Sequence, residues 1–252
     1  MPDRHARYNP GMTPSNDADV AIAVETSGSQ GSVAVGRGAA VLAEETFDAR
    51  QAHSVALLPT ADRLLAACAA TPRDLRRVYV SVGPGSFTGL RIGVTFARTI
   101  AFAAGARIVP VSSLATVAQN AATMTDPPER VAVLLDAKRR HVFAQCFAFD
   151  GTAYAPVDEA AERDPADYLP SLGAVAVLGE GVARHGAALA ACPAVTVLSG
   201  EFHQASARAV YALGTALAAE GRFVEADALT PVYIRRPEAE ERWEQRQGAG
   251  KP

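Results

Sequence analysis

Cysteine is scarce in this 252-residue sequence, which contains only Cys68, Cys146 and Cys192. The three lie far apart, and no two have the short spacing of a zinc or redox motif. Each has apolar neighbours, so we expect reduced thiols in a core. The sequence therefore offers no disulfide framework and no cysteine-based metal site.

Histidine is also sparse, and none of the five histidines has another at i+4. A helix that holds a metal ion through two histidines needs that spacing. We expect each to be a buried or solvated side chain, and we expect no metal bound by this chain. The five are His5, His53, His141, His185 and His203.

The sequence has no long apolar run and no basic excess. No segment approaches the ~20 apolar residues of a membrane span, and the net charge is −3. That charge argues against a protein that holds nucleic acid alone through a basic face. We expect a cytoplasmic protein without membrane contact. Residues 1–19 lack an apolar signal core and 237–252 are charged, so both are predicted to be flexible tails, and Met12 is a candidate true start.

Apolar runs alternate with helical patterns in an order that occurs twice. Each copy has three strands, a helix, a strand, a helix and a strand. The first has strands at 20–24, 32–35, 40–43, 78–80 and 108–111, with helices at 54–69 and 86–104. The second has strands at 131–135, 141–147, 174–178 and 195–198, and a further strand that follows the turn at Asp150-Gly151. Its helices are at 165–172 and 205–220, with another that follows the turn at 179–181. This predicts tandem duplicated α/β units, 20–112 and 113–236, with mixed sheets flanked by helices. The last helix is a candidate to pack back on the first unit.

A glycine-rich turn, residues 81–94, joins a strand to a helix in the first unit. Gly83, Pro84 and Gly85 suit a tight turn, and Ser86 can cap the helix. Free N–H groups at a helix start suit an anion. There is no Walker-type lysine, however, so the alternative is a turn that lets the helix pack tightly on its sheet. The candidate nucleotide or phosphate residues are Glu25, Ser27, Gly83, Gly85, Ser86 and Asp136.

Small residues recur every four positions along the following helix, which places them on one face. Glycine inside a helix costs roughly 1 kcal/mol against alanine, so a close contact must compensate. The rest of the helix is apolar, and we expect it to be buried nearly all round. The stripe faces either a partner or the protein's own sheet. The candidate interface residues are Leu57, Leu58, Ala61, Leu65, Gly89, Gly93, Ala97 and Ala101.

Two such units, each with an acidic residue ending its first strand, resemble the RNase H-like fold of the actin/sugar kinase/Hsp70 superfamily. Within it, the 83–93 stretch is similar to the signature of the TsaB family, accessory subunits in bacterial tRNA threonylcarbamoyladenosine synthesis. Further matches are 21–27, His53-Ser54, 57–59, 136–139 and the closing strand 231–235. Glu25 departs from the family's usual aspartate, and 136–139 has a lysine and one extra residue.

The resemblance implies a non-catalytic subunit that pairs with a TsaD-like catalytic subunit for threonylcarbamoyl transfer to adenosine 37 of tRNA. It implies a homodimer when alone, a TsaE-like ATPase reached through the complex, and tRNA contact only there. ATP and a metal then belong to the partners. The alternative is a stand-alone sugar-kinase-like phosphotransferase that uses Glu25 and Asp136 with the glycine turns at 83 and 179. A metalloprotease is a more distant alternative.

Overall fold

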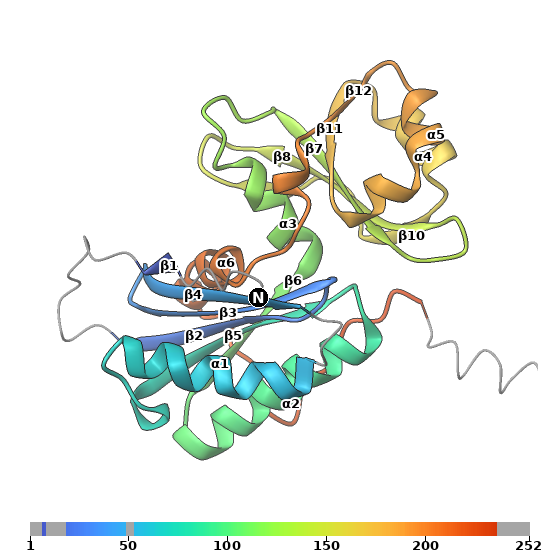
Figure 1. The fold of residues 1–252 in the computed structure, drawn as a ribbon. Helices are drawn as coiled ribbons and strands as arrows, with labels where there is room; N and C mark the ends of the chain where they lie inside the picture. Colours follow the sequence, from blue (N-terminus) through green and yellow to red (C-terminus); the bar gives the residue numbers. More distant parts are fainter. Residues whose placement is uncertain (1–6, 9–18, 49–52, 236–252) are drawn as a thin grey trace, which may run out of the picture.

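The computed structural model describes residues 7–8, 19–48 and 53–235 (Figure 1). The predicted tails, 1–19 and 237–252, lie outside the described residues except for 7–8 and Asp19, and so does Met12.

The first unit is a six-stranded mixed sheet with the strand order β1-β4-β3-β2-β5-β6. Its strands are β1 (Arg7–Tyr8), β2 (Val20–Glu25), β3 (Gln30–Arg37), β4 (Ala40–Asp48), β5 (Leu75–Gly83) and β6 (Arg107–Ser112). Strands β2, β3 and β4 pair antiparallel, whereas β5 and β6 continue parallel to β2. All six residues of β2 are buried. Such a continuous apolar strand is expected where helices cover both faces.

Helices α1 (His53–Ala67) and α2 (Phe87–Ala104) cover one face of this sheet, and α6 (Ala207–Ala219) covers the other (Figure 1). Val78 and Val80 of β5 point to the α1/α2 face, while Tyr79 between them points to α6. A short 3-10 turn, η2 (Pro72–Asp74), leads into β5. Alternation along one strand thus fills two separate cores.

The second sheet repeats the first in order and direction. Its path is β10-β8-β7-β11-β12, with β9 paired to β8. The strands are β7 (Arg130–Asp136), β8 (Val142–Phe149), β9 (Tyr154–Pro156), β10 (Ala161–Arg163), β11 (Val175–Leu178) and β12 (Val195–Val197). Strand β7 pairs antiparallel with β8 and parallel with β11, as β2 does with β3 and β5. The predicted duplicated α/β fold with mixed sheets is confirmed.

The helices of the second unit are shorter than those of the first. Helix α4 (Pro165–Leu172) forms as predicted. The helix expected after Gly179 is instead a 3-10 turn, η3 (Glu180–Arg184), and a five-residue helix, α5 (Gly186–Ala190). A second 3-10 turn, η4 (Gly200–Phe202), follows β12.

Each sheet is covered on one face by a helix that follows the other sheet in the sequence. Helix α3 (Ser113–Ala121), which follows the first sheet, packs Leu114 and Val117 against Val131 and Val133 of the second. Helix α6, which follows the second sheet, packs Val210 and Tyr211 against the first. The two units therefore interlock through their helices.

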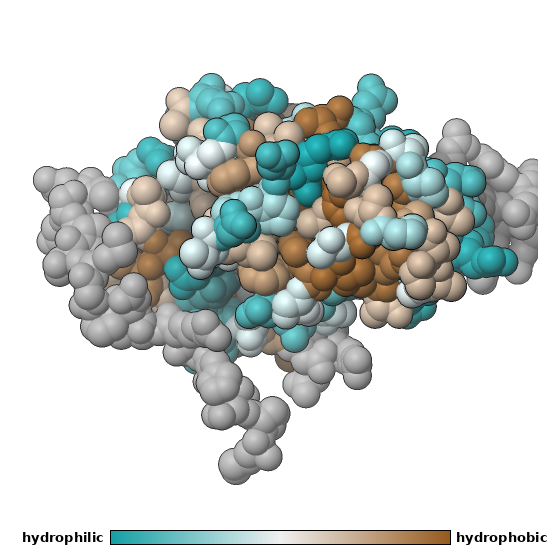
Figure 2. Space-filling model, turned by 90° about the horizontal axis from the view of Figure 1, so that it is seen from above, coloured by the Kyte–Doolittle hydropathy of each residue, from teal (hydrophilic) through white to brown (hydrophobic). Residues whose placement is uncertain are grey.

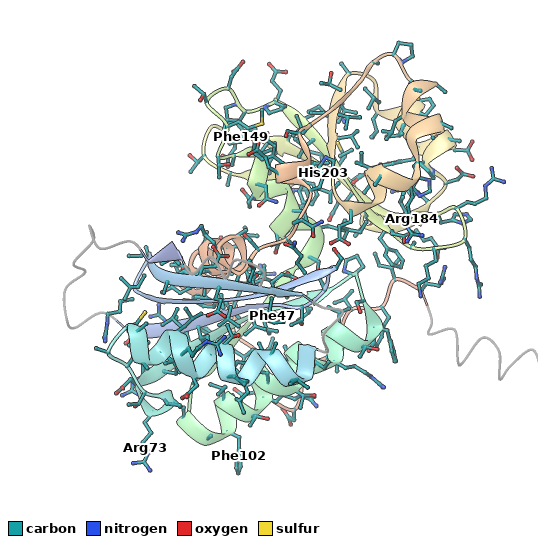
Figure 3. The ribbon with its side chains drawn as sticks, viewed as in Figure 1. Phe47, Arg73, Phe102, Phe149, Arg184 and His203 are labelled. Carbon is teal, nitrogen blue, oxygen red and sulfur yellow. The ribbon has the colours of Figure 1, made fainter. Side chains whose placement is uncertain are left out.

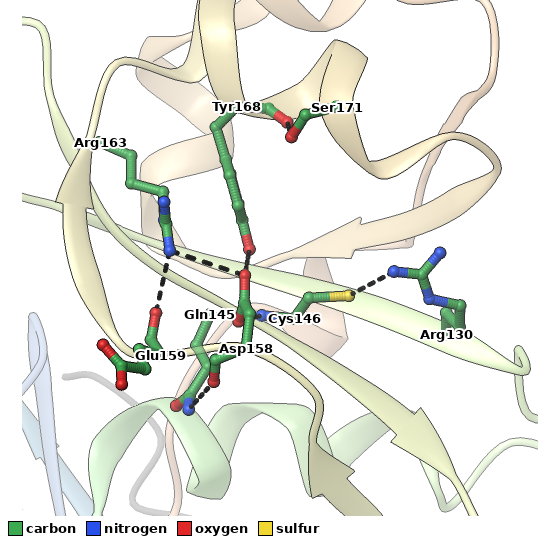
Figure 4. A network of polar contacts seen from close by, with 8 residues as sticks. All are labelled: Arg130, Gln145, Cys146, Asp158, Glu159, Arg163, Tyr168 and Ser171. Carbon is green, nitrogen blue, oxygen red and sulfur yellow. Dashed lines mark hydrogen bonds and ion pairs between the residues drawn. The ribbon is translucent and has the colours of Figure 1, made fainter.

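A polar network ties the link between β9 and β10 to the second sheet (Figure 4). The carboxylate of Asp158 accepts a hydrogen bond from the Cys146 N–H at 2.7 Å and another from the Tyr168 hydroxyl at 2.7 Å. The Gln145 amide donates to the Asp158 carbonyl at 2.9 Å. Burial, and then the bond to Asp158, raises the pKa of Tyr168. These bonds hold the link between β9 and β10, together with α4, against β8, so we assign the network a structural role.

Candidate functional site

The backbone that follows β2 packs directly against the glycine-rich turn. Ser86 begins α2 as its N-cap, and its Oγ accepts a hydrogen bond from the Gly89 N–H at 3.2 Å. The Ser86 N–H donates to the Ser27 carbonyl at 2.7 Å. A Cβ on Gly85 would overlap the Ser27 carbonyl, and one on Gly89 would overlap the carbonyl of Thr26. The glycines therefore allow the end of β2 to approach α2, and the Ser86 N–H is not free for an anion.

The turn that follows β2 is closed by a carboxylate from the second unit. Glu180 of η3 accepts hydrogen bonds from the Ser29 N–H at 2.9 Å and the Ser29 hydroxyl at 2.8 Å. A Cβ on Gly28 would lie 2.8 Å from the same carboxylate oxygen. A phosphate on this turn would have to displace Glu180 and would meet its negative charge. The geometry therefore disfavours the candidate phosphate loop made of Glu25, Ser27 and the glycine turn.

The two acidic residues that end equivalent strands have different surroundings. Asp136 is partly exposed, accepts a hydrogen bond from the Lys138 N–H at 2.9 Å and forms an ion pair with Arg184 at 3.2 Å. Glu25 is fully buried, and its Oε1 accepts a hydrogen bond from the Ser27 N–H. Its Oε2 has no hydrogen-bond partner among the described residues. Burial raises the pKa of Glu25, and the nearby charge of Glu180 adds to this, while the bonds from Ser27 oppose it.

We predict that Glu25→Gln stabilises the protein at neutral pH. The folded-state pKa lies above the ordinary value of 4.5, so the folded chain binds more protons than the unfolded chain as pH rises past that value. The wild type therefore loses stability as pH rises through the folded-state pKa, whereas glutamine has no charge to bury. Urea unfolding from pH 4 to pH 8 should show a stability advantage of the variant that grows with pH. An advantage that is constant or falls with pH contradicts a buried, raised Glu25.

An apolar hollow lies between the outward faces of α1 and α2. It has a volume of about 510 Å³, and a second hollow of about 450 Å³ shares Leu58 and Phe96 with it. Leu58 is 62% exposed. We call both hollows together the α1/α2 groove. Its first hollow is lined by Leu57, Leu58, Phe87, Thr88, Arg91, Ile92, Thr95, Phe96 and Thr99.

One end of the groove is bounded by stacked side chains. The Arg91 guanidinium lies 4.4 Å from the centre of the Phe87 ring, and the Tyr233 ring lies 5.2 Å from it. The segment that carries Tyr233 is held by the Val232 N–H, which donates to the Val82 carbonyl at 2.7 Å. Apart from this bond it is irregular, so the prediction of a closing strand at 231–235 is wrong.

Most predicted interface residues face the interior, not a partner. Leu57, Ala61, Leu65 and Ala97 are buried in the core between the helices and the first sheet, and Ala101 packs against it. A Cβ on Gly93 would lie 2.5 Å from the Thr26 Oγ1. The small-residue stripe, Gly89 included, therefore faces the protein's own sheet, and its assignment to an interface is wrong. Of the predicted residues only Leu58 is exposed.

The exposed face of α2 was missed, although the sequence carries a signal for it. Phe87, Arg91, Thr95 and Thr99 are all exposed and recur every four residues. This second stripe is offset by two residues from the glycine stripe, so it lies on the opposite side of the helix. The prediction that α2 is buried nearly all round is wrong for this reason.

Apolar surface also occurs elsewhere on the molecule. Seen from above, the molecule shows a group of hydrophobic residues right of the centre, bordered by hydrophilic ones (Figure 2). Within residues 19–48 and 53–235, no three His, Cys, Asp or Glu side chains are grouped closely enough to hold a metal ion. No helix of the described part of the chain has the length and apolarity to cross a membrane.

Known sequences show what this chain is similar to. Residues 47–166 match the model of the family described as "TsaD: tRNA N6-adenosine threonylcarbamoyltransferase". The tRNA threonylcarbamoyladenosine biosynthesis protein TsaB of Bacillus subtilis is 35% identical over 128 residues, 51% of this chain and 55% of that protein. Escherichia coli TsaB is 31% identical over 122 residues, 48% of this chain and 52% of that protein. The chain spans about half the length of the curated relatives it matches.

Solved structures extend the likeness to most of the chain. A Pseudomonas aeruginosa protein described as similar to peptidase YeaZ superposes with a TM-score of 0.75 and 25% identity, over 86% of this chain and 100% of that one. Pseudomonas aeruginosa YeaZ gives a TM-score of 0.73 and 24% identity, over 85% of this chain and 99% of that one. The likenesses support a TsaB/YeaZ-type protein with the actin-like ATPase fold, which confirms the resemblance seen in the sequence.

Proposed function

We propose that this chain is a non-catalytic subunit in tRNA threonylcarbamoyladenosine biosynthesis, and that it pairs with a TsaD-like catalytic subunit through the α1/α2 groove. The observation that carries the proposal is the exposed Leu58, which lines both apolar hollows. Contiguous exposed apolar surface of this kind marks interaction sites. The names of the relatives supply the pathway.

A partner of related fold fits this surface. The family model that matches residues 47–166 is that of TsaD, and this segment contains both α1 and α2. A TsaD-like subunit can therefore present its own version of the same helix pair. The contact would be a pseudo-twofold one, and a second copy of this chain would compete for it when no partner is present.

The closed turns of the first unit support a non-catalytic role. Glu180 occupies the turn at Ser29, and Ser27 occupies the glycine turn at Ser86. A phosphotransferase would need these turns open for its nucleotide. We therefore assign the binding of ATP and of a metal to the partner proteins. These are the TsaD-like subunit and a TsaE-like ATPase that joins through the complex. We assign tRNA binding to the complex as a whole.

The test is reconstitution with the TsaD-like subunit of the same organism. We expect the two proteins to elute together in size-exclusion chromatography. We expect threonylcarbamoyl transfer to tRNA from threonylcarbamoyl-adenylate only when both are present, and background turnover with this chain alone. Turnover by this chain alone that a chelator removes, or no joint elution and no stimulation, would overturn the proposal.

A further inference from the structure

Three consecutive cations occupy the turn between β7 and β8. Lys138, Arg139 and Arg140 have φ angles of 61°, 50° and 69°, which is the left-handed region. A residue with a Cβ is disfavoured there, and glycine or asparagine would be the usual choice. The backbone of the turn therefore gives no reason for three basic side chains. We call residues 138–140 the basic turn.

The basic turn is held in place from both sides. Asp136 accepts a hydrogen bond from the Lys138 N–H, and the Ala137 N–H donates to the His141 carbonyl at 3.1 Å. The His141 N–H closes the turn by donating to the Lys138 carbonyl at 3.0 Å. All three basic residues are exposed. Among the described residues, neither the Lys138 ammonium nor the Arg140 guanidinium has an ion-pair partner.

Two further arginines lie next to the basic turn. Arg184 of η3 lies at the edge of the second unit with a side chain 71% exposed, beside Asp136 (Figure 3). The Arg235 guanidinium donates to the Ala137 carbonyl at 2.9 Å and pairs with Glu162 at 3.3 Å. Both of these arginines are paired, Arg184 with Asp136 and Arg235 with Glu162. Among the described residues, the positive charge without an ion-pair partner here is that of Lys138 and Arg140, on a chain whose net charge is −3. The basic turn with Arg184 and Arg235 is the basic patch.

The basic patch adjoins the end of the α1/α2 groove. Tyr233 stacks on Phe87 at that end, and Arg235, two residues later, binds the Ala137 carbonyl. Two residues span at most about 7 Å of extended chain. A macromolecule held by a subunit in the groove can therefore reach the basic patch.

We infer that the basic patch binds the phosphate backbone of an RNA, so that this chain holds part of the tRNA within the complex. The inference rests on the proposed function, which supplies the complex. Lysine and arginine side chains on a fixed turn suit phosphate oxygens. Ala137, the apolar residue that precedes the basic turn, is buried. A protein-binding surface would need an apolar centre, which the patch lacks, so the charges favour RNA over an acidic protein.

The test measures the affinity of labelled, unmodified tRNA for the complex of this chain with the TsaD-like subunit. The variant is Lys138→Gln with Arg140→Gln. The matched control is Arg73→Gln with Arg76→Gln, two exposed arginines of the first unit that lie in η2 and at the start of β5. We expect the basic-turn variant to bind tRNA at least about fivefold more weakly at physiological salt. Its salt dependence, as the slope of log K against log salt, should be shallower by about 2, and the control should match the wild type.

Each outcome is decisive. Unchanged affinity and slope in the basic-turn variant, or an equal loss in the control, overturns the inference while the proposed function stands. Loss of pairing with the TsaD-like subunit, with tRNA affinity unchanged, also overturns it and assigns the patch to a protein contact. If the wild-type proteins do not pair, the proposed function fails. The tRNA affinities of the basic-turn variant, the control and the wild type are then compared on this chain alone at low salt, and weaker binding by the basic-turn variant alone supports the inference.

Discussion

Gly89→Ala is expected to destabilise the protein by about 3 kcal/mol, the upper end of overpacking in a closed core. The new Cβ would overlap the backbone carbonyl of Thr26 at the end of β2. Because that atom belongs to the backbone, no side-chain rotation can relieve the overlap. Separation of α2 from β2 would also lengthen the 2.8 Å hydrogen bond from the Thr26 hydroxyl to the Gly89 carbonyl. The gain in helix propensity of roughly 1 kcal/mol is smaller than these losses. Urea unfolding followed by circular dichroism measures the difference.

Substitutions at two other glycines should have smaller effects on stability and serve as comparisons. At Gly93 the nearest atom to a new Cβ is the Thr26 Oγ1, a side-chain atom and not a backbone one. Its displacement loses the hydrogen bond to the Gly89 carbonyl but does not require the backbones to separate, so Gly93→Ala should cost less than Gly89→Ala. At Gly186 nothing lies within 4 Å, so Gly186→Ala should change stability by no more than about 0.5 kcal/mol. Equal stability of Gly89→Ala and the wild type would show that α2 does not rest on Thr26.

Leu58→Asp is expected to weaken pairing with the TsaD-like subunit by about 30-fold or more. A central anchor residue contributes about 2 kcal/mol or more to an interface, and each 1.4 kcal/mol is a factor of ten. Aspartate would also place an unpaired charge beside two apolar hollows. Leu58 is 62% exposed in the free chain, so the unfolding free energy should stay within about 0.5 kcal/mol of the wild type. Calorimetric titration measures the affinity.

Phe102→Asp is the matched control. Phe102 lies on α2 and is 93% exposed, but it lines neither hollow (Figure 3). The same change of an exposed apolar residue to aspartate should leave pairing unchanged there. Full affinity of the Leu58 variant, or equal weakening by both variants, would remove the groove as the docking surface.

The duplicated fold was predictable because each unit begins with a strand buried on both faces. Such strands are nearly continuous apolar runs, as in residues 20–24 and 131–135, and they remain visible without an alignment. The start of α2 was predictable for a local reason, since Ser86 caps the helix it precedes.

The site was less predictable because it depends on which side of a helix meets the sheet. Periodicity shows that Gly89 and Gly93 share a face, but it does not say whether a sheet or a partner covers that face. The backbone of Thr26 decides it, and Thr26 is 63 residues from Gly89 in sequence. The contact of Glu180 with Ser29 spans 151 residues and leaves no local pattern.

The exchange of α3 and α6 between the sheets constrains how the chain can be synthesised and folded. The face of the first sheet that carries Ala23 and Tyr79 is covered by α6, which begins at Ala207. Until that segment has left the ribosome, a nascent chain keeps this apolar face uncovered, although all the strands of its sheet have been made. The first unit therefore cannot complete its core as an independent folding domain, and its final structure waits for the second unit.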